Sequence, residues 1–160
     1  MFGLKLTTRG RYGLRALIDL AVHEKEGAVS TQSIAQRQQI SESYLEQLIR
    51  SMKKAGLVGS VRGAGGGYHL ARPASEISVG DILRALEGDI DAVSCPALKD
   101  GEPDVAAGCA GSDWCVTKYV WKRINDAISD AVDTIMLDQL VNESRVLLEE
   151  SGAEAVPCRN

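Results

Sequence analysis

Long apolar runs and histidines are scarce in this sequence. No apolar run approaches the roughly 18 residues needed to cross a bilayer, and the basic, interrupted N-terminus lacks the apolar segment of a signal peptide. Histidine occurs twice in 160 residues, and neither copy stands beside a serine or cysteine in a recognisable nucleophile motif. These absences predict a cytoplasmic protein that has no membrane partner and is not an enzyme.

Cysteine is missing from the first 94 residues and then occurs four times. Cys95, Cys109 and Cys115 have the spacing C-x13-C-x5-C, and Cys158 lies near the C-terminus. Nothing indicates secretion, so a metal or redox site is favoured over a disulfide framework. Thiolates are ligands for iron–sulfur clusters, zinc and copper(I). The spacing alone leaves these metals open, together with three unlinked thiols.

The rest of the composition is that of a folded, soluble chain of about one domain. Apolar residues make up 44% and charged residues 25%, which argues against disorder. The net charge of −4 conceals an asymmetry, because residues 1–72 hold 11 lysines and arginines against 5 acidic residues, and residues 73–160 hold 7 against 17. A basic first half indicates a polyanionic partner, unless the charges cluster by chance.

Helical periodicity predicts three helices before residue 56. They run from about Thr8 to Glu24, from a cap at Ser30 or Thr31 to about Gln38, and from a cap at Ser41 to the stop at Gly56. Strand-like residues 57–62 and 68–71 then flank a glycine-rich turn and predict a β-hairpin. No Gly-Lys-Ser/Thr follows the glycines, so a phosphate loop is excluded, and a plain flexible hairpin is the alternative to a DNA-binding wing.

The second half of the sequence predicts helices separated by one irregular segment. Ser78 and Asp81 form a capping-box pattern at the start of a helix that reaches about Glu87. Residues 88–113 have no clear periodicity, whereas apolar residues at helical spacing predict a long helix from about Trp114 to Ile135. A shorter element containing Leu137 follows, and we expect a loose tail from Gly152.

Three helices followed by a hairpin have the order of a winged helix-turn-helix. The N-terminal residues of its third helix face base edges in the major groove, where glutamine can pair with adenine and glutamate with cytosine. An arginine at the wing tip can enter a minor groove, and glycines let the backbone approach phosphates. Each side chain could instead be an ordinary solvated polar group. The predicted DNA-binding residues are Ser43, Tyr44, Glu46, Gln47, Arg50, Arg62, Gly65 and Gly66.

Three whole segments, residues 6–12, 40–48 and 56–68, resemble the family of IscR-type iron–sulfur cluster regulators. This family of winged-helix repressors also includes nitric-oxide and cysteine-metabolism regulators. The resemblance implies a homodimer joined by the long helix, with Ser43, Glu46 and Gln47 reading bases and Arg62 in the minor groove. It also implies a [2Fe–2S] cluster held by Cys95, Cys109 and Cys115 and supplied by the cluster-assembly machinery.

One ligand position departs from the resemblance. The family histidine three residues after the last cysteine is Lys118 here, and an ammonium has no lone pair to give. The candidates for a fourth ligand are solvent and the following residues: Asp113, Glu102, Asp104, Cys158, and His23 or His69 of a second subunit. The interval between the first two cysteines is also longer than in the best-known members.

The sequence therefore predicts a mostly α-helical protein with a small β-hairpin, built as a winged helix-turn-helix plus a long dimerisation helix. Residues 1–73 are the expected DNA-binding domain, residues 74–150 the cluster loop and dimerisation helices, and residues 151–160 a flexible tail. The expected function is repression at a double-stranded DNA operator of cluster-biogenesis genes. A nitric-oxide or redox sensor of the same family and a zinc-stabilised interaction module are the alternatives.

Overall fold

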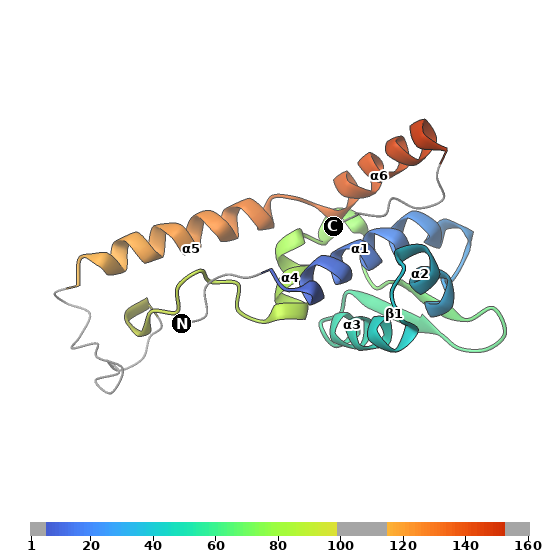
Figure 1. Cartoon of the computed structure of the whole chain (residues 1–160), viewed down its shortest axis with the longest axis horizontal. Coiled ribbons are helices and arrows are strands. Elements are labelled where there is room, and N and C mark those ends of the chain that lie inside the picture. The colour runs from blue at the N-terminus through green and yellow to red at the C-terminus, as the bar shows by residue number, and fades with distance from the viewer. Residues whose placement is uncertain (1–5, 99–114, 153–160) are drawn as a thin grey trace.

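The computed structural model describes residues 6–98 and 115–152, which form a compact winged-helix unit with one helix projecting from it (Figure 1). The elements of the winged-helix unit are α1 (Thr8–His23), η1 (Glu24–Glu26), α2 (Thr31–Gln38), α3 (Glu42–Lys54), β1 (Val58–Val61), β2 (Gly67–Leu70), η2 (Ala74–Glu76) and α4 (Val79–Glu87). The elements that follow are η3 (Pro96–Leu98), α5 (Thr117–Asp133) and α6 (Leu137–Ser151). The predicted fold class, mostly α-helical with a winged-helix hairpin, is confirmed.

The helix starts follow from local capping chemistry. The hydroxyls of Ser30, Ser41 and Ser78 accept hydrogen bonds from backbone N–H groups in the first turns of α2, α3 and α4. Asp81 completes the predicted capping box by accepting from the backbone N–H of Ser78. Between α2 and α3 the chain turns sharply at Gln39, which has a left-handed φ of 55°. The predicted beginnings of these three helices are confirmed.

The hairpin is a two-stranded antiparallel sheet with the register Val58↔Leu70 through Val61↔Gly67. A bridge between Val29 and Tyr68 joins the hairpin to the chain before α2. The hydrogen bond from Lys53 Nζ to Ser60 Oγ, 2.7 Å long, ties the end of α3 to β1. The wing is thereby fixed to both sides of the helix-turn-helix.

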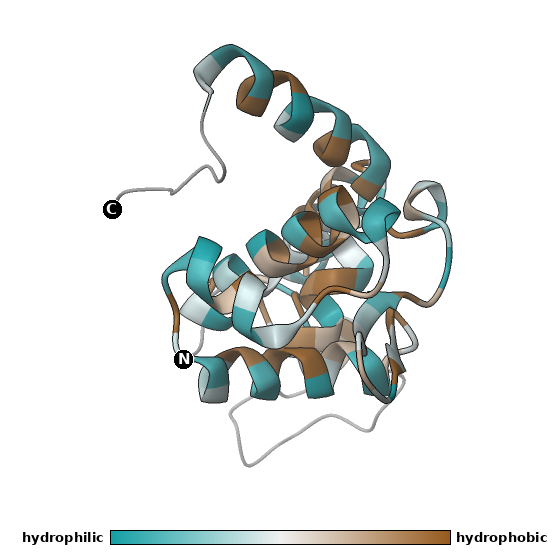
Figure 2. Cartoon of the chain, turned by 90° about the vertical axis from the view of Figure 1, so that its right-hand side faces the viewer, coloured by the Kyte–Doolittle hydropathy of each residue, from teal (hydrophilic) through white to brown (hydrophobic). Residues whose placement is uncertain are grey.

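One apolar core holds the winged-helix unit together. Helices α1 to α4 place most of their apolar positions, brown in Figure 2, on the sides that face their neighbours. Leu137 and Val141 of α6 are buried in this same core, at 0% and 4% exposure. The fully buried large side chains are Leu17, Leu20, Ile34, Leu45, Leu48, Met52, Leu57, Ile77, Ile82 and Leu137. The helix that follows α5 therefore returns to pack on the winged-helix unit.

The long helix is shorter than the sequence predicted. The prediction placed it between Trp114, which lies outside the described residues, and Ile135, whereas α5 spans 17 residues from Thr117 to Asp133, about 26 Å. Its end is set by contacts with α4. The carbonyl of Ile135 accepts a hydrogen bond from the Val79 N–H at 2.9 Å, so the chain leaves the helix to meet α4 there.

An ion pair joins α4 to α5 near that end. The two terminal guanidinium nitrogens of Arg84, Nη1 and Nη2, donate to the carboxylate of Asp133 at 2.6 and 2.9 Å. The hydrogen bond from Arg84 lowers the pKa of Asp133, and the same hydrogen bond raises the pKa of Arg84. Both side chains are about two-fifths exposed, so solvent screens the pair and its contribution to stability is small.

Candidate nucleic-acid interface and cysteine site

Helix α3 presents one polar face to solvent. Leu45, Leu48 and Ile49 are buried at 0–3% exposure, and this fixes the rotation of the helix about its axis. The side chains that point away from the core are those of Ser43, Glu46, Gln47 and Arg50, all exposed. The structure thus brings four of the predicted DNA-binding residues onto one accessible helix face, which has the dimensions to enter a major groove.

Tyr44 has a different environment from the other predicted DNA-binding residues of α3. Its ring is half-buried and packs edge-on against Tyr12 of α1, with the centroids 6.1 Å apart. The guanidinium of Arg15 lies over the Tyr12 ring at 5.2 Å. The Tyr44 hydroxyl is buried and has no hydrogen-bond partner within the described part of the chain. The structure places Tyr44 where it orients the first turn of α3 against α1.

A buried carboxylate on α1 holds α2, and sequence reasoning did not identify it. Asp19 is 6% exposed and accepts from Arg37 through both guanidinium Nε and Nη2, the shortest contact being 2.6 Å. Gln38 Nε2 donates to the same carboxylate at 2.8 Å, and Gln38 Oε1 accepts from Arg15 Nε at 3.0 Å. An acidic residue inside the apolar stretch of α1 was the available signal, because buried charges require partners.

The wing tip is exposed and glycine-dependent. Arg62 and Gly65 are exposed, and Gly66 is half-buried. Gly65 has a φ of 77°, and a Cβ on Gly66 would lie 2.5 Å from the Val61 carbonyl oxygen, so the turn accepts only glycine there without distortion. Arg62 directly follows β1, and the hairpin lies beside α3 in the winged-helix unit (Figure 1).

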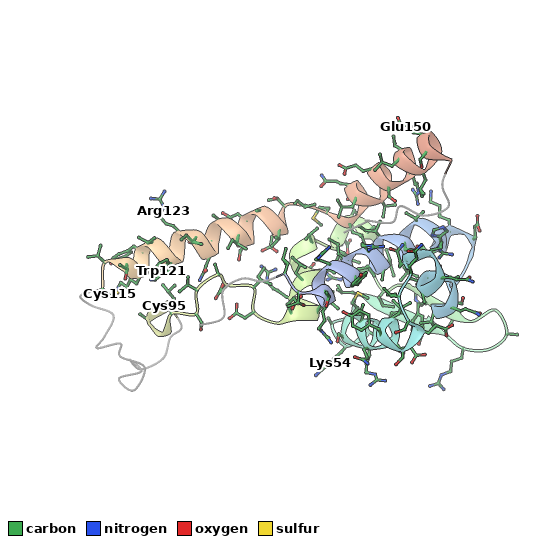
Figure 3. All side chains as sticks on the ribbon, in the orientation of Figure 1. Lys54, Cys95, Cys115, Trp121, Arg123 and Glu150 are labelled. Atoms are coloured by element: carbon green, nitrogen blue, oxygen red, sulfur yellow. The ribbon has the colours of Figure 1, made fainter. Side chains whose placement is uncertain are left out.

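Two of the predicted metal ligands lie at the far end of the molecule from the wing. Cys95 precedes η3, Cys115 precedes α5, and Figure 3 shows both near the N-terminal end of α5. Both have free thiols and are half-buried. Cys109, the third predicted ligand, and Cys158 lie outside the described residues. The structure therefore brings Cys95 and Cys115 to one end of the molecule.

The environment of Cys115 favours its thiolate. Its Sγ is 3.2 Å from the Thr117 hydroxyl, and this hydrogen bond lowers the pKa of the thiol. A hydrogen bond from the Lys118 backbone and the positive charge of the Lys118 side chain lower the pKa further. Thiolate, rather than thiol, is the form that binds metals. Cys115 is thus prepared for ligation by the first turn of α5.

The fourth ligand is not identified by the described residues. The Lys118 ammonium lies over the Tyr119 ring, 5.2 Å from its centroid. Within residues 6–98 and 115–152, no group of three or more histidine, cysteine or acidic side chains is placed to hold a metal ion. His23 Nδ1 lies 2.8 Å from the Asp19 carbonyl oxygen, and His69 belongs to β2. The candidates Asp113, Glu102, Asp104 and Cys158 fall outside the described residues.

The sequence model of the Rrf2 family, described as an iron-dependent transcriptional regulator, matches residues 6–143. The chain belongs to the Rrf2 family. It is 44% identical over 144 residues to the HTH-type transcriptional regulator IscR of Pectobacterium carotovorum, covering 90% of this chain and 83% of the relative. The corresponding identity to IscR of Escherichia coli O1:K1 is 40% over 144 residues, covering 90% and 84%. Both of these relatives are named as transcriptional regulators.

Solved structures of Rrf2 regulators have the same fold. The global cysteine regulator CymR of B. subtilis superposes with a TM-score of 0.69 at 42% identity, covering 88% of this chain and 98% of that one. T. potens IscR superposes with a TM-score of 0.68 at 43% identity, covering 96% and 95%. This Rrf2 protein is accordingly a DNA-binding transcriptional regulator of the winged-helix type. Among its described helices, none combines the length and apolar character needed to cross a membrane.

Proposed function

We propose that this protein is a homodimeric repressor that senses iron–sulfur cluster status through a [2Fe–2S] cluster and controls cluster-biogenesis genes in the cytoplasm. The observation that carries the proposal is the placement of Cys95 and Cys115, two free and half-buried thiols, at one end of the molecule in a chain that resembles IscR regulators. Cys109 is the third proposed ligand, and the cluster-assembly machinery is the proposed donor.

The donor set suits an iron–sulfur cluster. Thiolates are its usual protein ligands, and the hydrogen bond from Thr117, which lowers the pKa of Cys115, favours the thiolate form. When bound, the cluster supplies a centre whose occupancy depends on cellular cluster supply, oxygen and nitric oxide. The chain's part is to hold three thiolates. Lys118 leaves the fourth position to a weaker or exchangeable ligand, which would suit a sensor whose cluster must come and go.

Operator recognition is assigned to the exposed face of α3 and to the wing. With α3 in the major groove, Gln47 can donate to and accept from adenine, and Glu46 can accept from the amino group of cytosine. Ser43 and Arg50 lie on the same exposed face. Arg62 can then reach the adjacent minor groove, while the backbone at Gly65 and Gly66 approaches the phosphates. Tyr44 supports this face by packing under it.

A second copy of the chain is the proposed partner of α5. Apolar side chains recur at helical spacing along its first turns and remain exposed: Val116 (77%), Tyr119 (62%), Val120 (48%) and Ile124 (38%). An exposed apolar stripe on a projecting helix indicates an interface, because leaving it in water is unfavourable. Two-fold pairing would place two α3 helices on one operator, as half-site recognition by dimers requires.

The experiment that tests the proposal is anaerobic purification followed by visible absorbance, iron and acid-labile sulfide analysis, and zinc analysis. We expect visible absorbance and equal amounts of iron and sulfide, which a [2Fe–2S] centre requires. A colourless protein with stoichiometric zinc would instead support a zinc-stabilised module. Rapid bleaching by nitric oxide, with unchanged occupancy under cluster starvation, would support the nitric-oxide sensor. A colourless, metal-free protein would contradict the proposal.

A further inference from the structure

Helix α5 buries a polar residue. Asn125, 8% exposed, is the one residue of α5 that is buried, in a helix whose apolar residues near its start are exposed. An amide is costly to bury unless its hydrogen bonds are made. A helix that buries an asparagine and exposes valine and tyrosine must place that asparagine for a specific contact.

The Asn125 amide is almost fully used by two residues of another segment. Its Oδ1 accepts from the backbone N–H groups of Ala92 and Val93, at 3.0 and 3.3 Å. Its Nδ2 donates to the Val93 carbonyl oxygen at 3.1 Å. The side chain therefore makes three of the four hydrogen bonds that an amide can make, all to the backbone. Ala92 and Val93 belong to no helix or strand, and the Asn125 side chain binds their backbone groups.

Ala92 and Val93, the two residues that Asn125 binds, lie just before the proposed ligand Cys95. Cys95 follows Val93 by two positions, and Cys115 lies ten residues before Asn125 on the chain that opens α5. Upstream, Ile90 is 5% exposed and packs with Val79 and Leu83 of α4. The segment that carries Cys95 is thus held at two points, by Ile90 against α4 and by the Asn125 amide against α5.

We infer that Asn125 is a positioning residue that fixes Cys95 relative to Cys115. By binding the backbone at Ala92 and Val93, it attaches the Cys95 segment to the helix that carries Cys115, so the two thiolates are preorganised before a cluster arrives. The part of this inference that concerns the cluster rests on the proposed function. The attachment of the Cys95 segment to α5 through Asn125 does not. Preorganising the ligands lowers the entropic cost of binding, and supporting residues of this kind tune metal affinity about 10–100-fold.

The test uses the full-length protein with Asn125→Ala and Asn125→Asp. Alanine removes all three hydrogen bonds. Aspartate keeps the acceptor oxygen that binds Ala92 and Val93 but replaces the donor to Val93 by an oxygen that faces the Val93 carbonyl. Asn142→Ala on α6 is the matched control, because Asn142 is exposed. Circular dichroism checks folding. Amide hydrogen exchange at Ala92 and Val93 is measured in the apoprotein, and the rate of cluster loss to a chelator is measured in the loaded protein.

We expect exchange at both amides to accelerate by at least about tenfold in Asn125→Ala, to accelerate less in Asn125→Asp, and to be unchanged in Asn142→Ala. Cluster loss should accelerate about 10–100-fold in Asn125→Ala. Unchanged exchange in Asn125→Ala would show that Asn125 does not hold the backbone at Ala92 and Val93. Faster exchange with unchanged cluster loss would overturn the positioning role. If the wild-type protein holds no cluster, the proposed function fails. The exchange measurement still decides whether Asn125 holds the backbone at Ala92 and Val93.

Discussion

Arg62 is the residue whose position in the wing most directly links geometry to DNA binding. It is exposed beside the tight glycine turn. We expect Arg62→Ala to weaken operator binding by about 1–3 kcal/mol if the guanidinium contacts bases, and by less if it contacts only phosphate. Fluorescence anisotropy with an operator duplex measures this. Arg123→Ala, an exposed arginine on α5 (Figure 3), is the control, and unchanged binding by Arg62→Ala would remove the wing from the interface.

In the proposed complex, Glu46 would place a negative charge in a groove that the phosphates make negative. This is unfavourable unless a cytosine amino group donates to the carboxylate. We therefore expect Glu46→Ala to broaden sequence choice, with tighter binding to non-cognate duplexes. Selection from randomised duplexes measures the change, and Glu42→Ala, an exposed glutamate one turn earlier, is the control. A uniform loss of affinity for all duplexes would show that Glu46 serves the stability of α3.

Lys118 occupies the position where the resembling regulators carry a ligating histidine. Lys118→His supplies an imidazole lone pair at that place, so we expect slower cluster loss and a shifted visible spectrum. Lys122→His, one turn further along α5, is the control. Serine at Cys95, Cys109 or Cys115 should abolish the cluster, whereas Cys158→Ser should not. If Cys158→Ser alone bleaches the protein, the tail thiol is the fourth ligand.

At the scale of elements, the crossing of α1 and α4 depends on the absence of a side chain. A Cβ on Gly13 would lie 2.2 Å from Leu86 Cδ1, and Leu86 is itself 5% exposed in the core. Overpacking costs about 1–3 kcal/mol, against about 1 kcal/mol gained from the helix propensity of alanine. We expect Gly13→Ala to lower the free energy of unfolding by up to about 2 kcal/mol. Urea denaturation measures it.

A double variant tests whether the cost of Gly13→Ala arises from its contact with Leu86. Leu86→Ala leaves a cavity and should cost about 2–5 kcal/mol alone. In the Leu86→Ala background the methyl of Gly13→Ala has space, so it should be neutral or stabilising. Additive losses in the double variant would contradict the steric explanation.

At the scale of the whole molecule, charge separates the DNA-binding end from the rest. Residues 1–72 are basic and residues 73–160 acidic, so we expect the winged-helix unit to face the phosphates although the overall charge is −4. We expect the logarithm of operator affinity to fall linearly with the logarithm of salt concentration, by about 0.9 per phosphate neutralised. Titrations at several salt concentrations measure the slope. A slope near zero would contradict docking through the basic half.

Much of this architecture could be predicted because its signals are local. Ser30, Ser41 and Ser78 cap helices through contacts within three residues, and the stripe of α3 needs only helical periodicity to separate buried leucines from exposed readers. The end of α5 could not be predicted in this way. Its apolar pattern continues to Ile135, but the Ile135 carbonyl binds Val79, a residue 56 positions earlier.

The sequence by itself determined the capped helices, the glycine wing and the exposed face of α3, because each depends on neighbours within a few residues. The tertiary structure decided the features that depend on contacts between residues far apart in the sequence. It turned Asn125 inward onto Ala92 and Val93, packed Tyr44 against Tyr12, and buried Asp19 under Arg37. These contacts join residues that are 18 to 33 positions apart, and a polar residue carries no local sign of which distant partner will satisfy it.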